Sequence, residues 1–230
     1  MPATDALPLA EGEKQRLLRI SIDLHVHTRR YSACAPTLAP GQIVDILNSG
    51  QLDGVVLTDH DILWPKDEIR ALNANLRRGR IYRGMEASSR NGHFILIGVE
   101  DVRGIHPGSP LSTLQSAAHA QGGVVIWAHP HQCYGQITQP LDDTRLPVGI
   151  DAIEVASTVT TARAATAARG LARRYGLPMV AGSDAHCAAA VGQALTRFAQ
   201  LPADEAALAE MIRSGLCTPH VLDPILEACS

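Results

Sequence analysis

The sequence predicts a single α/β domain whose strands close into a barrel, and three observations lead to that prediction. Short apolar runs alternate with longer helical stretches along the chain. About seven or eight such units fit within the 230 residues, which suits a compact barrel better than an open doubly wound sheet. Polar residues gather at the carboxyl ends of the apolar runs. No glycine-rich phosphate loop follows the first run, which argues against a dinucleotide-binding fold.

The strand predictions follow the apolar runs, which are nearly continuous. Runs of this kind are typical of parallel strands that helices cover on the outer face of the sheet. We expect strands at residues 20–27, 54–59, 81–87, 93–99, 124–129, 152–156, 179–182 and 194–198.

Helices are expected between most of these strands. Gly50, Gly122 and Gly176 follow three of the helical stretches, at positions where a left-handed residue commonly ends a helix. Residues 1–16 show no sustained period, so we expect a flexible leader there and one barrel domain over 17–230. The expected helices are 40–50, 66–78, 111–121, 161–175 and 203–214.

The composition narrows the class of protein. A hydrophobic content of 46% with 19% charged residues is typical of a globular domain, and a net charge of -3 argues against a broad electrostatic contact with nucleic acid. We find no signal-peptide pattern and no apolar stretch long enough to span a bilayer. The five cysteines form no Cys-x-x-Cys pair. We therefore expect a reduced, cytoplasmic setting without disulfides.

Histidines and carboxylates stand at or just beyond the ends of the expected strands. Asp23, His25 and His27 are spaced by two, so they share one face of a strand. In a TIM-like barrel the carboxyl ends of the strands form the active-site face, and these side chains are divalent-metal ligands. The sequence therefore predicts a metal-dependent hydrolase. The later motifs are Thr58-Asp59-His60, Gly84-Met85-Glu86, Ala128-His129-Pro130 and Gly182-Ser183-Asp184-Ala185-His186.

Individual roles follow from these positions. Glu86 ends a run that is expected to be buried, so its carboxylate needs a partner. A bridge between two metal ions is one interpretation, and an ion pair with an arginine such as Arg83 or Arg90 is the other. We expect Asp184 to bind metal and to orient the attacking hydroxide. Either His60 or His186 could protonate the leaving oxygen when it is not committed to metal.

Other polar residues are expected beside the metal ligands. Asp23 is expected to lie behind the imidazoles of His25 and His27, as an acceptor that orients a histidine ring. Asp59 is either a ligand or an orienting group, and Glu154 either bonds a ligand histidine or faces the barrel mouth. Arg29 and Arg30 follow the first strand, where they either bind a phosphate or form a solvated loop pair.

Taken in order, the motifs resemble the polymerase-and-histidinol-phosphatase (PHP) family of metal-dependent phosphoesterases. The resemblance runs from about Ile20 to Phe198 and covers most of the chain. It implies a distorted TIM-like (β/α)7 barrel with two or three divalent ions, commonly zinc, manganese or iron, at the carboxyl ends of the strands. The motifs are Asp-Leu-His-Val-His-Thr at 23–28, Leu-Thr-Asp-His-Asp at 57–61, Gly-Met-Glu at 84–86, Gly-His-Phe-Ile-Leu-Ile-Gly at 92–98, Ala-His-Pro at 128–130, Ile-Glu-Val at 153–155 and Gly-Ser-Asp-Ala-His at 182–186.

The resemblance also implies a set of metal ligands, and it adds His93, which spacing alone marks weakly. One segment departs from the family. Where many relatives carry an acidic residue or a second histidine that helps to hold a third metal, this chain has Cys34. Cys34 is then either a substitute ligand, because a thiolate binds zinc, or a small buried thiol beside an empty or weak third site. The implied ligands are His25, His27, His60, Glu86, His93, His129, Asp184 and His186.

The expected activity is hydrolysis of a small phosphomonoester, of the nucleotide or sugar phosphate type, by a metal-activated hydroxide. A phosphodiesterase or nuclease is an alternative, against which stand the acidic balance and the scarcity of aromatic residues. A metal-dependent carbonyl hydrolase and a non-catalytic metal-binding module that serves a partner protein are the others. We expect no membrane contact and nucleic acid only as a short substrate. The oligomeric state stays open.

Overall fold

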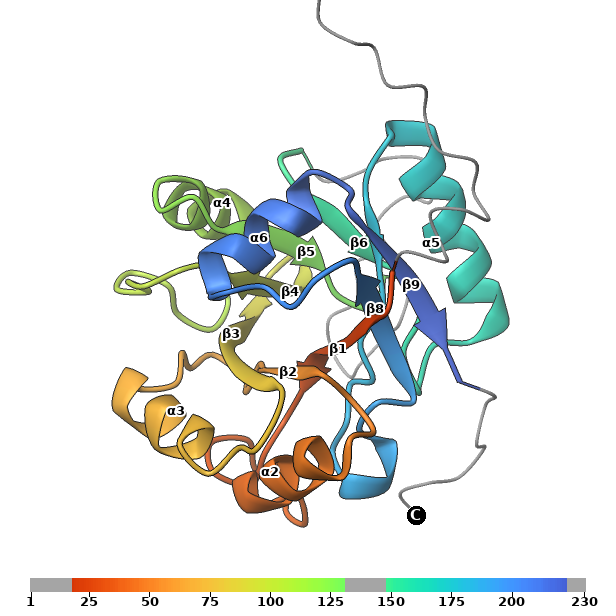
Figure 1. The fold of residues 1–230 in the computed structure, drawn as a ribbon. Coiled ribbons are helices and arrows are strands. Elements are labelled where there is room, and N and C mark those ends of the chain that lie inside the picture. The colour runs from red at the N-terminus through yellow and green to blue at the C-terminus, as the bar shows by residue number, and fades with distance from the viewer. Residues whose placement is uncertain (1–17, 131–147, 223–230) are drawn as a thin grey trace, which may run out of the picture.

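Nine strands form one curled sheet in the described part of the chain, in the order β7-β6-β5-β4-β3-β2-β1-β8-β9 (Figure 1). The computed structural model describes residues 18–130 and 148–222, so the expected leader lies outside the described residues. A β-bridge joins Val26, the last residue of β1, to Ala185 beyond β7. Because β7 is one edge of the sheet and β1 lies near the opposite edge, this contact brings the sheet into a nearly closed barrel.

The strands occupy all eight of the expected apolar runs, and a ninth strand follows the last helix. Its residues show neither a long apolar run nor a clear alternation, which is why it was not expected. The strands are β1 Ile20–Val26, β2 Gly54–Leu57, β3 Arg80–Ser89, β4 Gly92–Ile97, β5 Val124–Trp127, β6 Ala152–Glu154, β7 Met179–Val180, β8 Ala194–Phe198 and β9 Cys217–Val221.

The strand directions correct the expectation of a parallel sheet. The strands β1, β2 and β3 run parallel to one another, as do β5, β6 and β7. However, β4 is antiparallel to both of its neighbours, β8 is antiparallel to β1, and β9 is antiparallel to β8. Only Arg90 and Asn91 separate β3 from β4. A connection this short can only return antiparallel to the strand before it.

Helices pack around the outside of the strands (Figure 1). Gly50 and Gly176 adopt the left-handed conformation at the ends of two helices, as expected. The second expected helix is shorter than predicted and ends at Asn73, whose side chain pairs with the backbone of Ile81 through both its oxygen and its nitrogen. The helices are α2 Pro40–Ser49, α3 Lys66–Asn73, α4 Leu111–His119, α5 Ala162–Tyr175 and α6 Glu205–Arg213, with a short 3-10 helix η1 at Ala188–Ala190.

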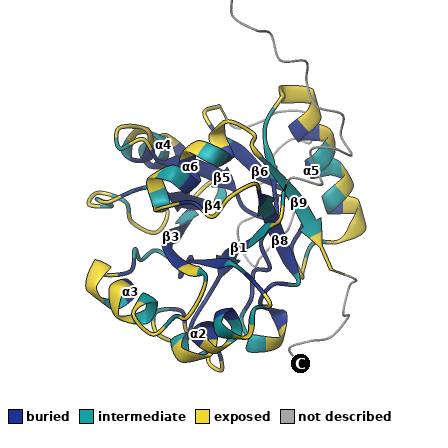
Figure 2. Cartoon of the chain, viewed as in Figure 1, coloured by how far each residue is buried: buried dark blue, intermediate teal, exposed yellow. Residues whose placement is uncertain are grey.

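Burial explains why the strands read as continuous apolar runs. Figure 2 shows the strands largely buried and the outward faces of the helices exposed. Successive residues of β2 from Val55 to Leu57 are all fully buried, because one face packs inside the barrel and the other packs under the helices. None of the described helices combines the length and the apolar composition that a membrane crossing needs.

One cysteine departs from expectation. Cys187, directly after His186, is disulfide-bonded. The expectation that the chain has no disulfides is therefore wrong at this position. Cys34 and Cys217 are free thiols.

Candidate metal centre

The buried carboxylate of Glu86 lies at the middle of the predicted site. Its residue is 1% exposed and stands on the part of β3 that points toward the rim of the barrel. One carboxylate oxygen, Oε1, lies 2.9 Å from Nε2 of His129 and 3.1 Å from Nδ1 of His93. His93 is the second residue of β4, and it reaches this rim because β4 runs antiparallel to β3. The spacing argument marked His93 weakly because it assumed that β4 was parallel.

The second oxygen of Glu86, Oε2, faces the end of β1. It lies 3.2 Å from Nε2 of His27 and 3.4 Å from Nε2 of His25. Those two ring nitrogens are 3.1 Å apart. Oδ1 of Asp184 lies 3.3 Å and 3.5 Å from the same two nitrogens of His27 and His25. Glu86 therefore has one set of donors on each of its oxygens, as a carboxylate that bridges two metal ions would.

The backbone near these donors is held in unusual conformations. Asp184 has φ 55° and His129 has φ 26°, in the region that non-glycine residues rarely adopt. Gly182 lies against His25, and a Cβ added at Gly182 would stand 2.5 Å from the Cβ of His25. Only glycine fits at this close approach, so the position of His25 depends on Gly182.

Glu154, at the end of β6, connects two of the histidines. Its Oε1 lies 3.1 Å from Nδ1 of His25, and its Oε2 accepts a hydrogen bond of 2.8 Å from the backbone N–H of His129. When Nδ1 of His25 donates to Glu154, the Nε2 lone pair points toward Glu86 and Asp184. Of the two interpretations of Glu154, the structure supports the one in which it bonds a ligand histidine.

Asp23 does not orient an imidazole, contrary to expectation. Its carboxylate accepts hydrogen bonds from the backbone N–H groups of His25 at 3.2 Å, Ser183 at 2.8 Å and Gly192 at 2.8 Å. Burial raises the pKa of Asp23 to about 6, although these donors oppose the shift. Asp23 therefore ties β1 to the segment that carries Asp184, and it positions ligands through the backbone.

Asp59 acts in a similar way on the loop after β1. It accepts hydrogen bonds from the backbone N–H of Thr28 at 2.7 Å and from the Thr28 hydroxyl at 2.9 Å. The indole N–H of Trp64 donates to the same carboxylate at 2.7 Å. Both oxygens are thus occupied, which favours the interpretation of Asp59 as an orienting group over that of a ligand.

The arginines near the site contribute less to it than the sequence predicts. Arg30 forms a two-pronged ion pair with Glu68 of α3, with both contacts at 3.0 Å, so its charge is already compensated. Arg29 is exposed beside it. Arg83 contacts Glu100 and not Glu86, which excludes the alternative of an ion pair between Glu86 and that arginine.

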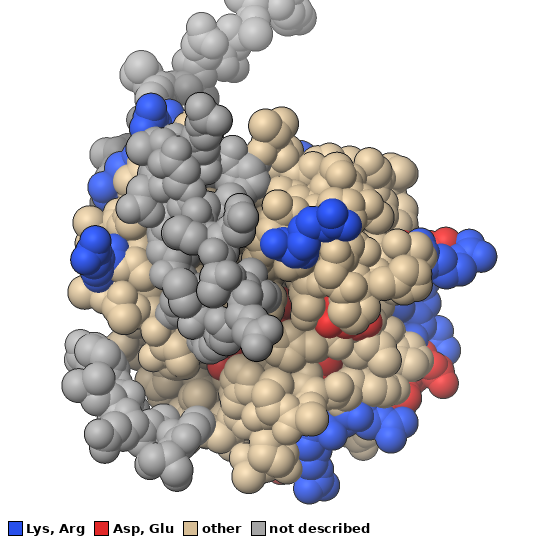
Figure 3. All heavy atoms as spheres, turned by 180° about the vertical axis from the view of Figure 1, so that it is seen from behind, with Lys and Arg blue, Asp and Glu red and all other residues tan. Residues whose placement is uncertain are grey.

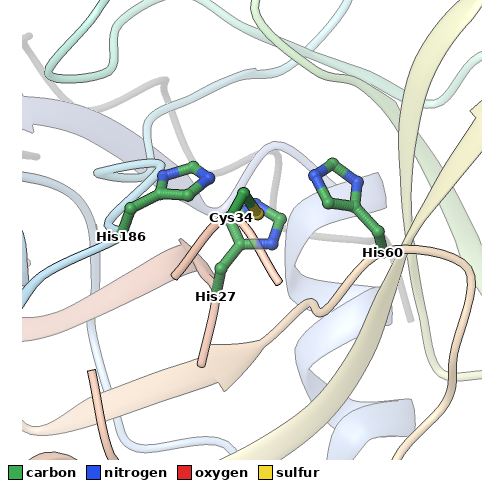
Figure 4. A group of neighbouring side chains, drawn as sticks. All are labelled: His27, Cys34, His60 and His186. Atoms are coloured by element: carbon green, nitrogen blue, oxygen red, sulfur yellow. The ribbon is translucent and has the colours of Figure 1, made fainter. Parts of the chain in front are cut away.

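A second group of donors lies at the outer side of the centre. Sγ of Cys34 and ring nitrogens of His27, His60 and His186 all lie within 4.8 Å of one another. Figure 4 shows these side chains turned toward a common point from separate segments of the chain. Nδ1 of His186 lies 2.8 Å from the backbone oxygen of Asp184, to which it can donate while Nε2 stays available. We call Cys34, His60 and His186 the outer group.

The remaining ligands form what we call the inner group. It joins the two sides of Glu86, and its members come from β1, β3, β4 and the segments after β5 and β7. All eight ligands implied by the family resemblance thus lie in one of the two groups. The inner group consists of His25, His27, Glu86, His93, His129 and Asp184.

The electrostatics differ between the two groups. Burial alone would lower the pKa of His25 and His27, but neighbouring carboxylates raise the pKa of His25 well above its ordinary value and that of His27 to about 9. For His60 and His186 burial prevails, and the pKa lies below its ordinary value. Burial would raise the pKa of Glu86, but the imidazoles around it, His25 foremost, hold it well below the usual range.

The residues present fit divalent metal ions. Oε2 of Glu86 and Nδ1 of His60 are buried and have no hydrogen-bond partner. Groups of this kind are costly unless something else satisfies them. Two imidazole nitrogens on one tetrahedral zinc ion stand about 3.3 Å apart, given zinc–nitrogen distances of about 2.05 Å. The 3.1 Å between His25 and His27 matches that spacing.

Comparison with known proteins agrees with this geometry. Residues 162–217 match the PHP-associated family. The resemblance to PHP proteins is confirmed. No curated protein sequence matches the chain. The prediction of a metal-dependent hydrolase is consistent with the family match and with the donor set.

Solved structures share the fold. PsfC from Pseudomonas syringae aligns with a TM-score of 0.63 and 19% identity over 89% of this chain and 92% of its own. A two-domain Bacteroides vulgatus protein "containing predicted PHP-like metal-dependent phosphoesterase" gives 0.61 and 17% over 88% of this chain and 65% of its own. Endonuclease Q from Pyrococcus furiosus gives 0.60 and 14% over 90% of this chain and 60% of its own. The predicted distorted α/β barrel is thereby confirmed.

Proposed function

We propose that this chain is a metal-dependent phosphoesterase that hydrolyses a small phosphomonoester. The observation that carries the proposal is the buried Glu86, which has histidines at both oxygens and one oxygen without a hydrogen-bond partner. A buried carboxylate in such surroundings is suited to hold two cations. The match to the PHP-associated family and the fold shared with PHP-like proteins support the choice of phosphate esters as substrates.

The inner group provides two metal positions. His93 and His129 would hold one ion with Oε1 of Glu86. The other position has His25, His27 and Asp184 beside Oε2. When bound, such ions would lower the pKa of a water molecule to supply a hydroxide and would stabilise the negative charge on the phosphoryl oxygens.

The chain's own residues orient the metal ligands and shield them from solvent. Glu154 fixes the ring of His25 and the backbone of His129, while Asp23 fixes the segment that carries Asp184. The inner histidine His25 is fully buried, whereas the side chains of His60 and His186 are each 32% exposed, so we expect a substrate to approach from the outer side. There burial lowers the pKa of His60 and His186, which favours the unprotonated ring that binds a cation. A ring that holds no cation could instead pass a proton to a leaving oxygen.

Charge at the surface fits a small anionic substrate better than a long nucleic acid. Figure 3 shows Asp and Glu atoms in a hollow of one face, with Lys and Arg atoms distributed around it and no continuous basic stripe in view. The net charge of the chain is -3. A protein that follows a nucleic-acid backbone usually presents a basic groove. Arg29 is exposed in the loop between β1 and α2 that also carries Cys34, and we propose it as the arginine that contacts the phosphate.

A phosphodiester substrate is the second candidate. The fold is similar to that of endonuclease Q, which has been crystallised in complex with a 27-mer duplex bearing an abasic lesion at the active site. That protein is longer, since this chain covers 61% of it, so the likeness bears on the barrel alone. A short nucleotide diester therefore belongs in any test of the substrate.

The test is phosphate release from a panel of phosphomonoesters and one diester, using protein whose bound metals have been counted. We expect release from monoesters that a chelator abolishes. Asp184→Asn should lower it by at least about a hundredfold, because loss of a direct ligand exceeds the 10–100-fold typical of outer partners. Asp67→Asn, an exposed change on α3, is the matched control and should leave the rate unchanged. No release with two or more metals bound would overturn the proposal.

A further inference from the structure

The outer group contains the one sulfur donor found near the centre in the described residues. We propose that Cys34, His60 and His186 hold a third divalent cation through one thiolate and two imidazoles, and that this position prefers thiol-binding ions such as zinc to manganese or magnesium. This inference rests on the proposed function, because it extends the same centre. It concerns what this chain carries in place of the acidic residue or histidine of its relatives.

Three separate segments bring the donors together. Cys34 lies in the loop between β1 and α2, His60 follows β2, and His186 lies beyond β7. Their ligand atoms lie within 4.8 Å of one another, and the side chains converge in Figure 4. With zinc–sulfur distances of about 2.3 Å and zinc–nitrogen distances of about 2.0 Å, one ion can reach donors that are this close.

Each donor of the outer group keeps a ring nitrogen or a sulfur for a cation. Nδ1 of His60 lies 3.0 Å from Oε2 of Glu86, so Nε2 is the His60 atom that would meet the outer ion. Nδ1 of His186 can donate to a backbone oxygen, which places the Nε2 lone pair on the free side of the ring. Nδ1 of His60 is buried and makes no hydrogen bond. A cation here would bind Sγ of Cys34 and one ring nitrogen of each histidine, atoms that lie within 4.8 Å of one another.

The donor types set the preference among ions. Thiolate and imidazole are ligands of zinc and cobalt, whereas manganese and magnesium prefer carboxylate, carbonyl and water oxygens. The outer group contains no carboxylate, while the inner group contains two, from Glu86 and Asp184. Binding would release the thiol proton of Cys34 to solvent as the sulfur–metal bond forms, with no change in oxidation state. Cys34 is exposed, so an ion can reach it from solvent.

The test uses the full chain loaded with cobalt(II) and examined by absorption spectroscopy and metal counting. A thiolate bound to cobalt gives a charge-transfer band in the near ultraviolet. We expect this band and three metals per chain in the unaltered protein. Cys34→Ala should remove the band and one of the three metals. Cys217→Ala, which removes the second free thiol among the described residues, from β9, is the matched control and should change neither.

Further measurements distinguish loss of the third metal from loss of the fold. His186→Ala should also cost one metal, while circular dichroism reports whether each variant is folded. Three bound cobalt ions without a thiolate band would overturn the inference, as would a band that survives Cys34→Ala. In competition, manganese should fill two positions and leave the third to zinc; three tightly bound manganese ions would equally overturn it. None of these readouts depends on phosphate release, so failure of the inference is separable from failure of the proposed function.

Discussion

The inner and outer groups differ in burial and in the kinds of donor atom they contain, so we expect them to bind metal ions differently. His25 and Glu86 are 0% and 1% exposed, whereas the side chains of His60 and His186 are each 32% exposed. Carboxylates occur in the inner group and a thiol in the outer group. The inner donors lie on strands or shortly after their ends, and hydrogen bonds to Glu154 and Asp23 fix their positions. The outer position is assembled by loops, where Cys34 could replace another donor without disturbing the core.

The largest effect that separates the two groups is expected for Glu86→Gln. The change keeps the shape of the side chain but removes the charge that both inner positions share. We expect loss of both inner metals and a fall in phosphate release of at least about a thousandfold, since several kcal/mol of charge stabilisation disappear. Metal counting and single-turnover phosphate release measure the two effects. Retention of two inner metals would show that Glu86 does not bridge them.

Gly182→Ala tests the inner group through the backbone. The new methyl group would stand 2.5 Å from the Cβ of His25 and 2.7 Å from its backbone nitrogen, so β1 must shift. We expect a loss of about 1–3 kcal/mol in the free energy of unfolding, as is typical of overpacking, together with weaker metal binding. Urea unfolding measures the first effect and calorimetric titration the second.

Gly170→Ala is the matched control for that change. Gly170 lies within α5, and nothing stands within 4 Å of an added Cβ. This substitution should leave metal binding unchanged and raise the free energy of unfolding by up to about 1 kcal/mol, because alanine favours a helix. Equal effects of the two substitutions would mean that the close approach of Gly182 to His25 is unimportant.

Glu154→Gln should have an intermediate effect. It weakens the contact with Nδ1 of His25 and the hydrogen bond from the backbone of His129 without removing a metal ligand. We expect metal affinity or turnover to fall by about 10–100-fold. Glu210→Gln, on the exposed face of α6, is the control and should have no effect. An unchanged affinity in Glu154→Gln would contradict the role assigned to this residue.

The smallest effect concerns the order in which metals leave. Because the outer group is partly exposed, a chelator should remove one metal per chain first and the inner pair more slowly. Cys34→Ala should abolish the fast phase and keep the slow one. Stopped-flow measurement with a coloured chelator resolves the phases. A single phase for all metals would remove the distinction between the two groups.

Most of the fold was predictable because hydrophobic runs and glycine positions are local signals. The strand directions were less predictable from the sequence. The β3–β4 hairpin turns at Arg90 and Asn91, where the Asn91-Gly92 pair is a turn signal that the apolar runs alone do not register, and β9 has little apolar pattern. Direction matters for function here, since it is the antiparallel course of β4 that brings His93 to Glu86.

The ligands themselves were predictable from the motifs, whereas the residues that support them were predicted less well. Asp23 and Asp59 bind backbone and side-chain donors from segments that lie far away in sequence, such as Ser183 and Trp64. No spacing rule reveals which donor a carboxylate will meet across a barrel. The ion pair of Arg30 with Glu68 could not be predicted from the sequence for the same reason.

The most direct test of the central claim is a crystal structure of the metal-loaded protein with anomalous data collected at the zinc edge. The account predicts two peaks on either side of Glu86, one near His93 and His129 and one near His25 and His27. A third peak should lie between Cys34, His60 and His186. Absence of any peak within bonding distance of Glu86 would contradict the account.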